Sequence, residues 1–200
     1  MQRTIAAFAA AVAVLATAAA PAVAKKKPPV PAEPAGTIVD VAVGASSLDG
    51  PDGNGKDYDL LIAAVLATGL ADDLSGDTEL TVFAPNDRAF QKLVATLTGA
   101  DELPTEAEAL DAVLATFTVE QITEILLYHV TPGTLDSAAV LASGPLTMLN
   151  GGTVTPAKAF RLADETDGLK NPKLVKKGLD LFATNGVIHT IDRVLVPDLS

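Results

Sequence analysis

The chain contains no cysteine and no tryptophan, and only two histidines are present among its 200 residues. The absence of cysteine excludes disulfides, thiol nucleophiles and cysteine-ligated metals, so a domain of this size must depend on its apolar core for stability. Two histidines are also too few for a zinc site, which normally uses three or four protein ligands. We therefore expect no metal site and no cofactor.

Serine is the remaining candidate for nucleophilic catalysis. A serine nucleophile needs an adjacent base, normally a histidine, and in many hydrolases it lies in a G-x-S-x-G turn. No such turn occurs, and the serines fall in predicted loops or at a helix start: Ser46, Ser47, Ser75, Ser137, Ser143 and Ser200. The sequence therefore predicts a non-enzymatic protein.

Basic residues are scarce relative to acidic ones. The chain has 14 Lys and Arg against 25 Asp and Glu, a net charge of −11. Such a surface repels nucleic acid and anionic lipid, so we expect neither as a general partner. No apolar run after the N-terminal segment approaches the ~20 residues of a membrane helix, so we expect no stable membrane insertion.

The N-terminal residues 1–24 are typical of a secretory signal peptide. Arg3 supplies the positive charge, residues 5–20 form an apolar run, and an Ala-Val-Ala sequence matches a small-residue cleavage site. A membrane anchor is the alternative, but the run is short for one. We expect a secreted protein that is extracellular, periplasmic or associated with the cell surface.

The mature chain divides into a linker and one domain. The sequence KKKPPVPAEPA at residues 25–35 is rich in proline and lysine and lacks apolar periodicity, which predicts an extended linker. Residues 36–200 have a length that suits a single domain.

Hydrophobic periodicity changes along this domain from helical to strand spacing. Helices are predicted over 37–43, 57–70, 86–97, 105–117, 118–130 and 134–142, with capping boxes that begin at Thr105 and Thr118. Strands are predicted over 79–85, 145–149, 152–156, 158–162, 173–177, 179–184 and 187–196. Helices followed by strands indicate an α+β fold rather than a doubly wound sheet.

A loop dense in Asp, Gly and Asn precedes the second predicted helix. Asp52, Asn54 and Asp57 resemble a calcium loop in composition, but the order of ligands and glycine in a calcium hand is missing. We interpret this segment as a solvated loop.

Both histidines fall among apolar residues, which favours a structural role. The helix predicted over 118–130 places His129 on its apolar face, and His189 lies in a strand that is apolar on both faces. A buried neutral imidazole needs a partner for each nitrogen. We expect Asn86 or Asp87 to bond His129, and a backbone group to bond His189.

Three further residues near the C-terminus have predicted structural roles. Asn185-Gly186 separates two strands by two residues, which predicts a type I′ hairpin with positive φ at both positions. Asp192 is a lone acid in an apolar strand, and we expect an ion pair with Arg193 or a hydrogen bond to a loop.

Three motifs occur in an order that resembles the fasciclin-like (FAS1) domain: TVFAPNDRAF at 81–90, LLYHVTPG at 126–133 and NGVIHTIDRVLVP at 185–197. The resemblance implies a β-wedge of two small sheets flanked by a layer of α-helices. It also implies a non-enzymatic, secreted module for adhesion, whose partner is a protein or polysaccharide at the cell surface or in the extracellular matrix. The short, alanine-rich signal sequence predicts that the protein is bacterial.

The resemblance also points to contact residues. The Tyr-His motif maps to Leu126, Leu127, Tyr128, His129 and Val130, and Tyr128 is expected to be exposed because it lies about 100° around the helix from His129. Insertions relative to the family pattern are candidate contact surfaces, at 49–57, 99–117 and 161–178. The last contains a basic cluster suited to an acidic polymer, formed by Lys170, Lys173, Lys176 and Lys177.

The sequence leaves open one alternative function, that of a carrier, and the oligomeric state. A carrier of a small apolar ligand would need a largely apolar pocket of roughly 300–1,000 Å³. The oligomeric state does not follow from the sequence.

Overall fold

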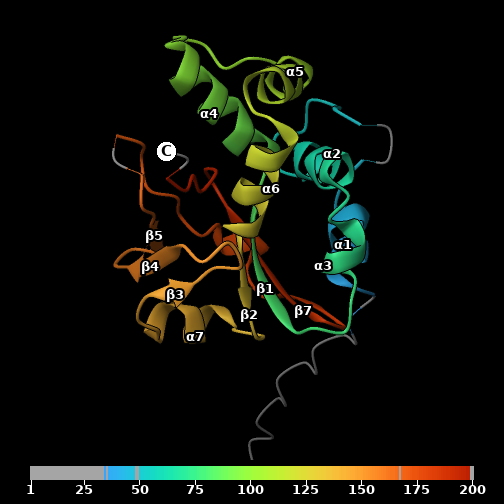
Figure 1. Ribbon diagram of the computed structural model, residues 1–200, viewed down its shortest axis with the longest axis vertical. Helices are drawn as coiled ribbons and strands as arrows, with labels where there is room; N and C mark the ends of the chain where they lie inside the picture. Colours follow the sequence, from blue (N-terminus) through green and yellow to red (C-terminus); the bar gives the residue numbers. More distant parts are fainter. Residues whose placement is uncertain (1–33, 35, 48–49, 167, 199–200) are drawn as a thin grey trace, which may run out of the picture. The chain divides into compact units, whose positions relative to one another are not determined.

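Most helices of the domain lie on one side of the strands, whereas the short helix Ser137–Ala142 lies beside them (Figure 1). The computed structural model describes residues 34, 36–47, 50–166 and 168–198, and Glu33–Ser200 forms one compact unit. Apart from Pro34, the expected signal peptide and linker lie outside the described residues. Asp49 and Asp167, which belong to two of the candidate insertions, also lie outside them.

Seven α-helices are present in the described part of the chain. They are α1 (Ile38–Gly44), α2 (Asp59–Thr68), α3 (Ala71–Leu74), α4 (Asp87–Thr98), α5 (Glu106–Thr116), α6 (Val119–Leu127) and α7 (Ser137–Ala142). The capping boxes predicted at Thr105 and Thr118 begin α5 and α6, and a third at Thr37 begins α1. Local sequence therefore determines where these helices start.

Two small sheets confirm the α+β class. The larger has the strand order β2 (Val130–Pro132), β1 (Leu80–Pro85), β7 (Gly186–Ile191) and β6 (Leu181–Ala183). Its central strands β1 and β7 are parallel, although they lie about a hundred residues apart in the chain. The smaller sheet consists of β3 (Leu146–Thr147), β4 (Thr153–Ala157) and β5 (Arg161–Ala163).

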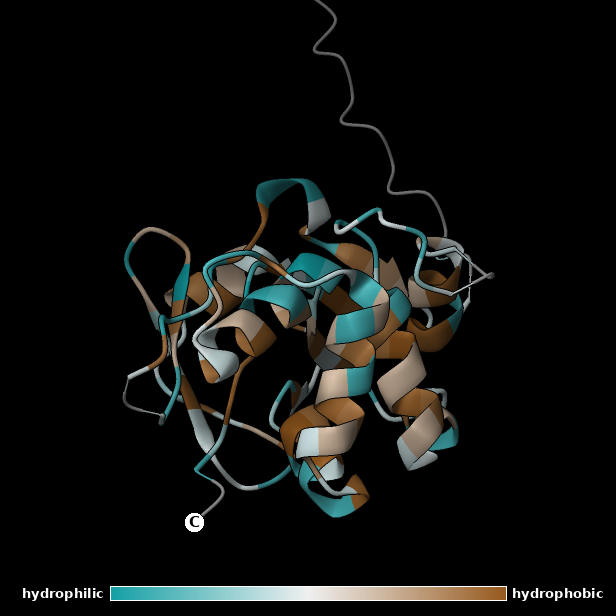
Figure 2. Cartoon of the chain, turned by 90° about the horizontal axis from the view of Figure 1, so that it is seen from above, coloured by the Kyte–Doolittle hydropathy of each residue, from teal (hydrophilic) through white to brown (hydrophobic). Residues whose placement is uncertain are grey.

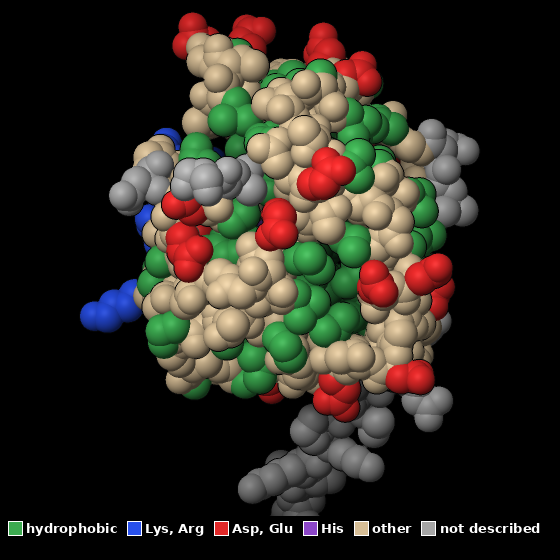
Figure 3. Space-filling view, in the orientation of Figure 1, with side chains coloured by type: hydrophobic (Ala, Val, Ile, Leu, Met, Phe, Trp, Pro, Cys, Tyr) green, Lys and Arg blue, Asp and Glu red, His purple; other side chains and the backbone are tan. Residues whose placement is uncertain are grey.

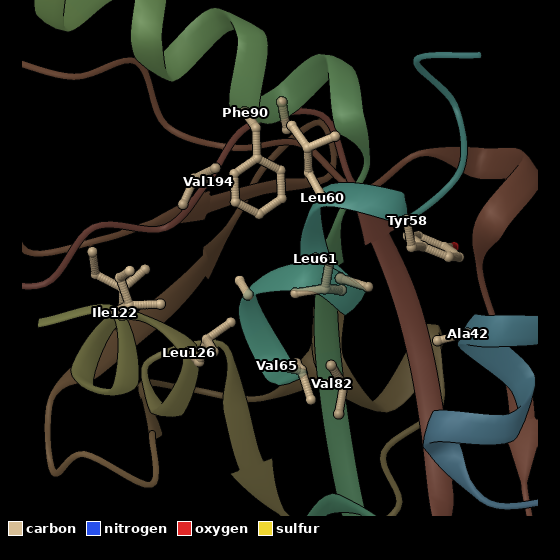
Figure 4. Close-up of a cluster of buried hydrophobic side chains, with 14 of the residues drawn as sticks. Ala42, Tyr58, Leu60, Leu61, Val65, Val82, Phe90, Ile122, Leu126 and Val194 are labelled. Atoms are coloured by element: carbon tan, nitrogen blue, oxygen red, sulfur yellow. The ribbon is translucent and has the colours of Figure 1, made fainter. Parts of the chain in front are cut away.

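The large sheet separates two apolar clusters, and alternate residues of β1 point to each. Val82 belongs to the larger cluster, which the helices cover, and Phe83 to the smaller one, which β3–β5 and α7 cover. Figure 4 shows the larger cluster, with Leu61 and Leu126 facing each other from α2 and α6. The hydropathy colouring shows the amphipathic helices with their hydrophilic stripes outward (Figure 2).

Several predicted elements differ in the structure. The helix predicted over 118–130 ends at Leu127, because Val130 and Thr131 pair with β1 as strand β2. The strand predicted over 173–177 is replaced by two isolated bridges and a 3₁₀ turn, Lys176–Gly178. Leu97 of α4 and Leu114 of α5 lie on the surface, where they are 51% and 45% exposed.

The β6–β7 turn lies one residue earlier than predicted. Ala183 pairs with Gly186, so Thr184 and Asn185 form the turn, and of the proposed pair only Gly186 has a positive φ, 151°. The type I′ prediction is therefore wrong. Asn185 is buried, and its side chain bonds the N–H of Ile38 and the carbonyls of Leu74 and Gly76, each at 2.8 Å. Tertiary contacts of this side chain, rather than the local turn preference, set the register.

Candidate functional site

Tyr128, the expected contact residue, is fully buried at the end of α6. Its hydroxyl donates to the Thr153 carbonyl at 2.8 Å and accepts the Glu165 N–H at 3.1 Å. Burial raises the pKa of Tyr128 to about 12. The prediction of an exposed Tyr128 is wrong because the unit formed by β3–β5 covers this side of α6, which helix geometry alone does not show.

Replacing Tyr128 with phenylalanine is expected to destabilise the domain by about 1–2 kcal/mol, because the Thr153 carbonyl and the Glu165 N–H lose their buried partner. Urea unfolding followed by circular dichroism measures the change. An unfolding midpoint equal to that of the wild type would show that the hydroxyl contributes no net stability.

His129 lies just beyond the helix end and is 2% exposed. Its Nδ1 donates to the Ile125 carbonyl at 2.7 Å, and its Nε2 accepts the Leu195 N–H at 2.9 Å. Burial lowers the pKa of His129 to about 4, so the ring is neutral near pH 7. The ring joins α6 to the segment after β7, which is a structural role.

The partners predicted for His129 are wrong, because Asn86 and Asp87 serve other groups. The Asn86 side chain accepts the Ala89 N–H at 3.0 Å and caps α4. Asp87 is fully buried and accepts the Leu60 N–H at 2.8 Å. These two residues of the first motif therefore fix the starts of α4 and α2.

His189 has backbone partners on both ring nitrogens, as expected. Its Nε2 donates to the Leu135 carbonyl at 2.8 Å, and its Nδ1 accepts the Asp180 N–H at 3.2 Å. Ser137 lies nearby, but its hydroxyl donates to the Asp180 carboxylate at 2.7 Å rather than to the histidine. The arrangement lacks the serine–histidine hydrogen bond that nucleophilic catalysis requires.

The rest of the Tyr-His motif is also largely inaccessible. Leu126 and Val130 are 5% and 3% exposed, and Leu127 alone within the motif is partly exposed. Direct contact of the four buried residues of this motif with a partner would require the domain to open.

The lysine segment, in contrast, lies on the surface. All four lysines of the predicted cluster are exposed. Lys170 and Lys173 line a hollow of about 390 Å³ together with Arg161, Asp192 and Arg193. Lys92 of α4 borders the adjoining depression with Lys170 and Arg193. We call the surface formed by Lys92, Arg161, Lys170, Lys173 and Arg193 the basic hollow.

Lys176 and Lys177 are not among the residues that line the hollow. The Lys176 ammonium instead lies 5.5 Å from the centre of the Phe160 ring, in a cation–π contact. The four lysines of the predicted cluster therefore divide into two pairs with different surroundings.

Asp192 holds the floor of the hollow in place. It accepts the Lys173 N–H at 2.7 Å, its backbone N–H donates to the Lys173 carbonyl at 3.0 Å, and its Oδ2 lies 3.9 Å from the Lys92 ammonium. The expected hydrogen bond to a loop is therefore present, whereas the ion partner is Lys92 rather than Arg193. Partial burial and the nearby Arg193 and Arg88 lower the pKa of Lys92, while Asp192 opposes the shift.

An apolar cavity of about 110 Å³ lies on the helical side of the large sheet, among α1, α2, α3 and the end of α6. Hydrophobic side chains gather on this part of the surface in Figure 3. The volume falls below the roughly 300–1,000 Å³ typical of small-molecule sites. This cavity therefore gives little support to the carrier alternative.

The chain is similar in sequence and in fold to known proteins. A sequence model described as the fasciclin domain matches residues 56–197. The chain belongs to the fasciclin domain family. The bacterial "Protein sll1483" of Synechocystis sp. is 32% identical over 163 residues, which cover 82% of this chain and 74% of that protein.

Fasciclin domains of animal proteins are also similar. "Transforming growth factor-beta-induced protein ig-h3" of Sus scrofa is 32% identical over 142 residues, which are 70% of this chain and 18% of the longer relative. The structure of a FAS1 domain pair from the insect cell adhesion molecule fasciclin I matches with a TM-score of 0.53 at 17% identity, over 84% of this chain and 52% of that one. That likeness confirms the fold.

The fasciclin family is generally non-enzymatic, which agrees with the hydrogen bonding of both histidines. Among the described residues, no helix combines the length and the apolar content needed to cross a bilayer.

Lys92, Arg161 and Arg193 belong to the basic hollow but not to the predicted lysine cluster. Lys92 and Arg193 lie outside the lysine segment, whereas Arg161 lies within the candidate insertion 161–178 and reaches Lys173 through an isolated bridge. No local pattern in this sequence indicates the grouping.

Proposed function

We propose that this fasciclin domain is a secreted, non-enzymatic module that binds an acidic protein or polysaccharide at the cell surface or in the extracellular matrix through the basic hollow. The presence of the domain in an insect cell adhesion molecule supports the general role. The concentration of positive charge in the hollow, on a chain of net charge −11, is the observation that carries the proposal.

The charge distribution favours a negatively charged partner. Acidic side chains are spread over the face seen in Figure 3, whereas Lys and Arg appear only at its left edge. Most of this surface repels a polyanion, so association is favoured in one orientation. Binding in that orientation should weaken as salt screens the charges.

The chemistry of the hollow suits carboxylate or sulfate groups on a polymer. Arg161 and Arg193 offer planar donor pairs that match a carboxylate, and Lys170 and Lys173 add mobile charges. Asp192 reduces the net charge, but its carboxylate already accepts a backbone N–H and faces Lys92. Arg161, Lys170, Lys173 and Arg193 line the hollow, whose volume of about 390 Å³ falls within the size range of a ligand site.

Charge reversal at Lys170 and Lys173 should weaken binding to immobilised alginate, a polyuronate, by about 10-fold or more at low salt, because two attractive contacts become repulsive. Biolayer interferometry over a series of salt concentrations measures the effect. Lys158→Glu with Lys177→Glu is the matched control, since both lysines are exposed and neither lines the hollow.

The control separates a specific surface from general charge. Equal losses in the two double variants would show that only net charge matters, and unchanged binding in Lys170→Glu/Lys173→Glu would exclude the hollow. Neutral dextran should bind none of the proteins.

A further inference from the structure

Four buried carboxylates converge where the N-termini of α2, α4 and α5 meet. Asp59, Asp87 and Glu106 are the first residues of these helices, and Asp57 lies two residues before α2. Asp57, Asp59, Asp87 and Glu106 are 5%, 5%, 0% and 3% exposed. The exposed Asp52 adjoins them, and we call all five the acidic cluster. The interpretation of residues 49–57 as a solvated loop is therefore wrong at Asp57.

The carboxylates lie within the spacing of a single ion's ligands. Asp59, Asp87 and Glu106 can each present one oxygen so that all three lie within 4.8 Å of one another, and so can Asp52, Asp57 and Asp59. Two oxygens at opposite sides of a calcium ion lie about 4.6–5.2 Å apart, because each Ca–O distance is about 2.3–2.6 Å. Asp59 belongs to both groups and joins them.

Hydrogen bonds orient the carboxylates, and those to Asp57 and Asp59 use one oxygen of each. The N–H groups of Leu60 and Gly53 donate to Asp87 and Glu106 at 2.8 and 2.7 Å. The Ser47 N–H donates to Oδ1 of Asp59 at 3.0 Å, and the Asn54 amide donates to Oδ2 of Asp57 at 2.8 Å. Such bonds resemble the outer contacts that hold metal ligands in position.

Within the part of the chain that the structure describes, two of the buried oxygens have no hydrogen-bond partner: Oδ1 of Asp57 and Oδ2 of Asp59. Buried polar atoms in native proteins are nearly always paired, and an unpaired carboxylate oxygen is among the most costly to leave. A ligand that accepts electron pairs from both oxygens would satisfy them, and a cation is such a ligand.

The surrounding charges do not neutralise the cluster. Neither ion pair found among the described residues includes a member of it. Three helix N-termini together contribute roughly +1.5 charges, at about +0.5 each, against up to four buried carboxylates. The described groups therefore leave the buried carboxylates without a full counter-charge.

We propose that the acidic cluster binds a calcium ion. All the donors are oxygen atoms, which disfavours zinc because zinc prefers nitrogen and sulfur ligands. Magnesium keeps several of its waters and normally takes fewer carboxylates from a protein than this cluster offers. The ion would tie the loop before α2 to the starts of α4 and α5. This site is separate from the basic hollow, so its test is independent of the proposed function.

Thermal unfolding of chelator-treated protein tests the site. With about 1 mM calcium chloride, we expect the melting temperature to rise by about 1–6 °C, which corresponds to the roughly 0.1–1 mM dissociation constants of extracellular calcium modules. The same concentration of magnesium chloride should give a smaller rise. Asp59→Asn should lose the calcium response, whereas Asp111→Asn, at an exposed position on α5, should retain it.

Terbium luminescence provides a second measurement that does not depend on the variants folding. The chain has no tryptophan, and Tyr58 lies between Asp57 and Asp59, so terbium in the cluster should be sensitised by this tyrosine. Calcium should displace the terbium and remove the signal. A melting temperature unchanged up to about 10 mM calcium, together with no calcium-sensitive luminescence, would overturn the proposal.

Discussion

Gly186→Ala lowers the free energy of unfolding by about 3–5 kcal/mol, the largest effect that we expect from a single added methyl group in this protein. A Cβ at this position would overlap the carbonyl oxygen of Leu80, an atom of the neighbouring central strand that cannot move without breaking the sheet. The backbone φ of 151° adds strain for any residue with a side chain. Chemical denaturation at neutral pH measures the loss.

Gly144→Ala is the matched control for this substitution. Gly144 has no positive φ, and a Cβ there meets no atom within 4 Å. We expect a change within about 0.5 kcal/mol, as for ordinary surface substitutions. Similar losses in both variants would show that the contact with Leu80 is not the cause.

Acid should destabilise the wild type more than the His129→Gln variant, by about 3 kcal/mol between pH 7 and pH 4. The folded protein holds the pKa of His129 at about 4, below its ordinary value of 6.5, because the ring is buried. Below pH 6.5 the unfolded chain therefore binds more protons than the native state. The contribution of His129 to stability is complete above pH 6.5 and is lost as the pH falls toward 4.

Glutamine is the informative replacement because it can donate to Ile125 and accept from Leu195 without titrating. Urea unfolding of both proteins from pH 7 to pH 4 gives the difference, and the carboxylates, which are common to both, cancel. Parallel stability curves would contradict the burial of a neutral ring. A lower stability of the variant at pH 7 would not contradict the prediction, because the prediction concerns how the free energy of unfolding changes with pH.

Several features that depend on neighbouring residues were predicted correctly, whereas the burial of Tyr128, which depends on a later segment of the chain, was not. The capping boxes at Thr105 and Thr118 begin their helices as predicted, because a cap involves residues three positions apart. His189 lies in a strand that is buried on both faces, as its apolar neighbours indicated. Tyr128 was misplaced because the chain that covers it follows some twenty-five residues later.

The sequence by itself determined the family, the α+β class and the starts of the helices, since these depend on motifs, periodicity and neighbouring residues. Only the tertiary structure decided that the Tyr-His motif is interior, that Arg161 and Arg193 join the lysines, and that Asp57, Asp59, Asp87 and Glu106 meet. The reason is physical: burial and charge clustering depend on which distant segments pack together. A single sequence carries no local signal of that packing.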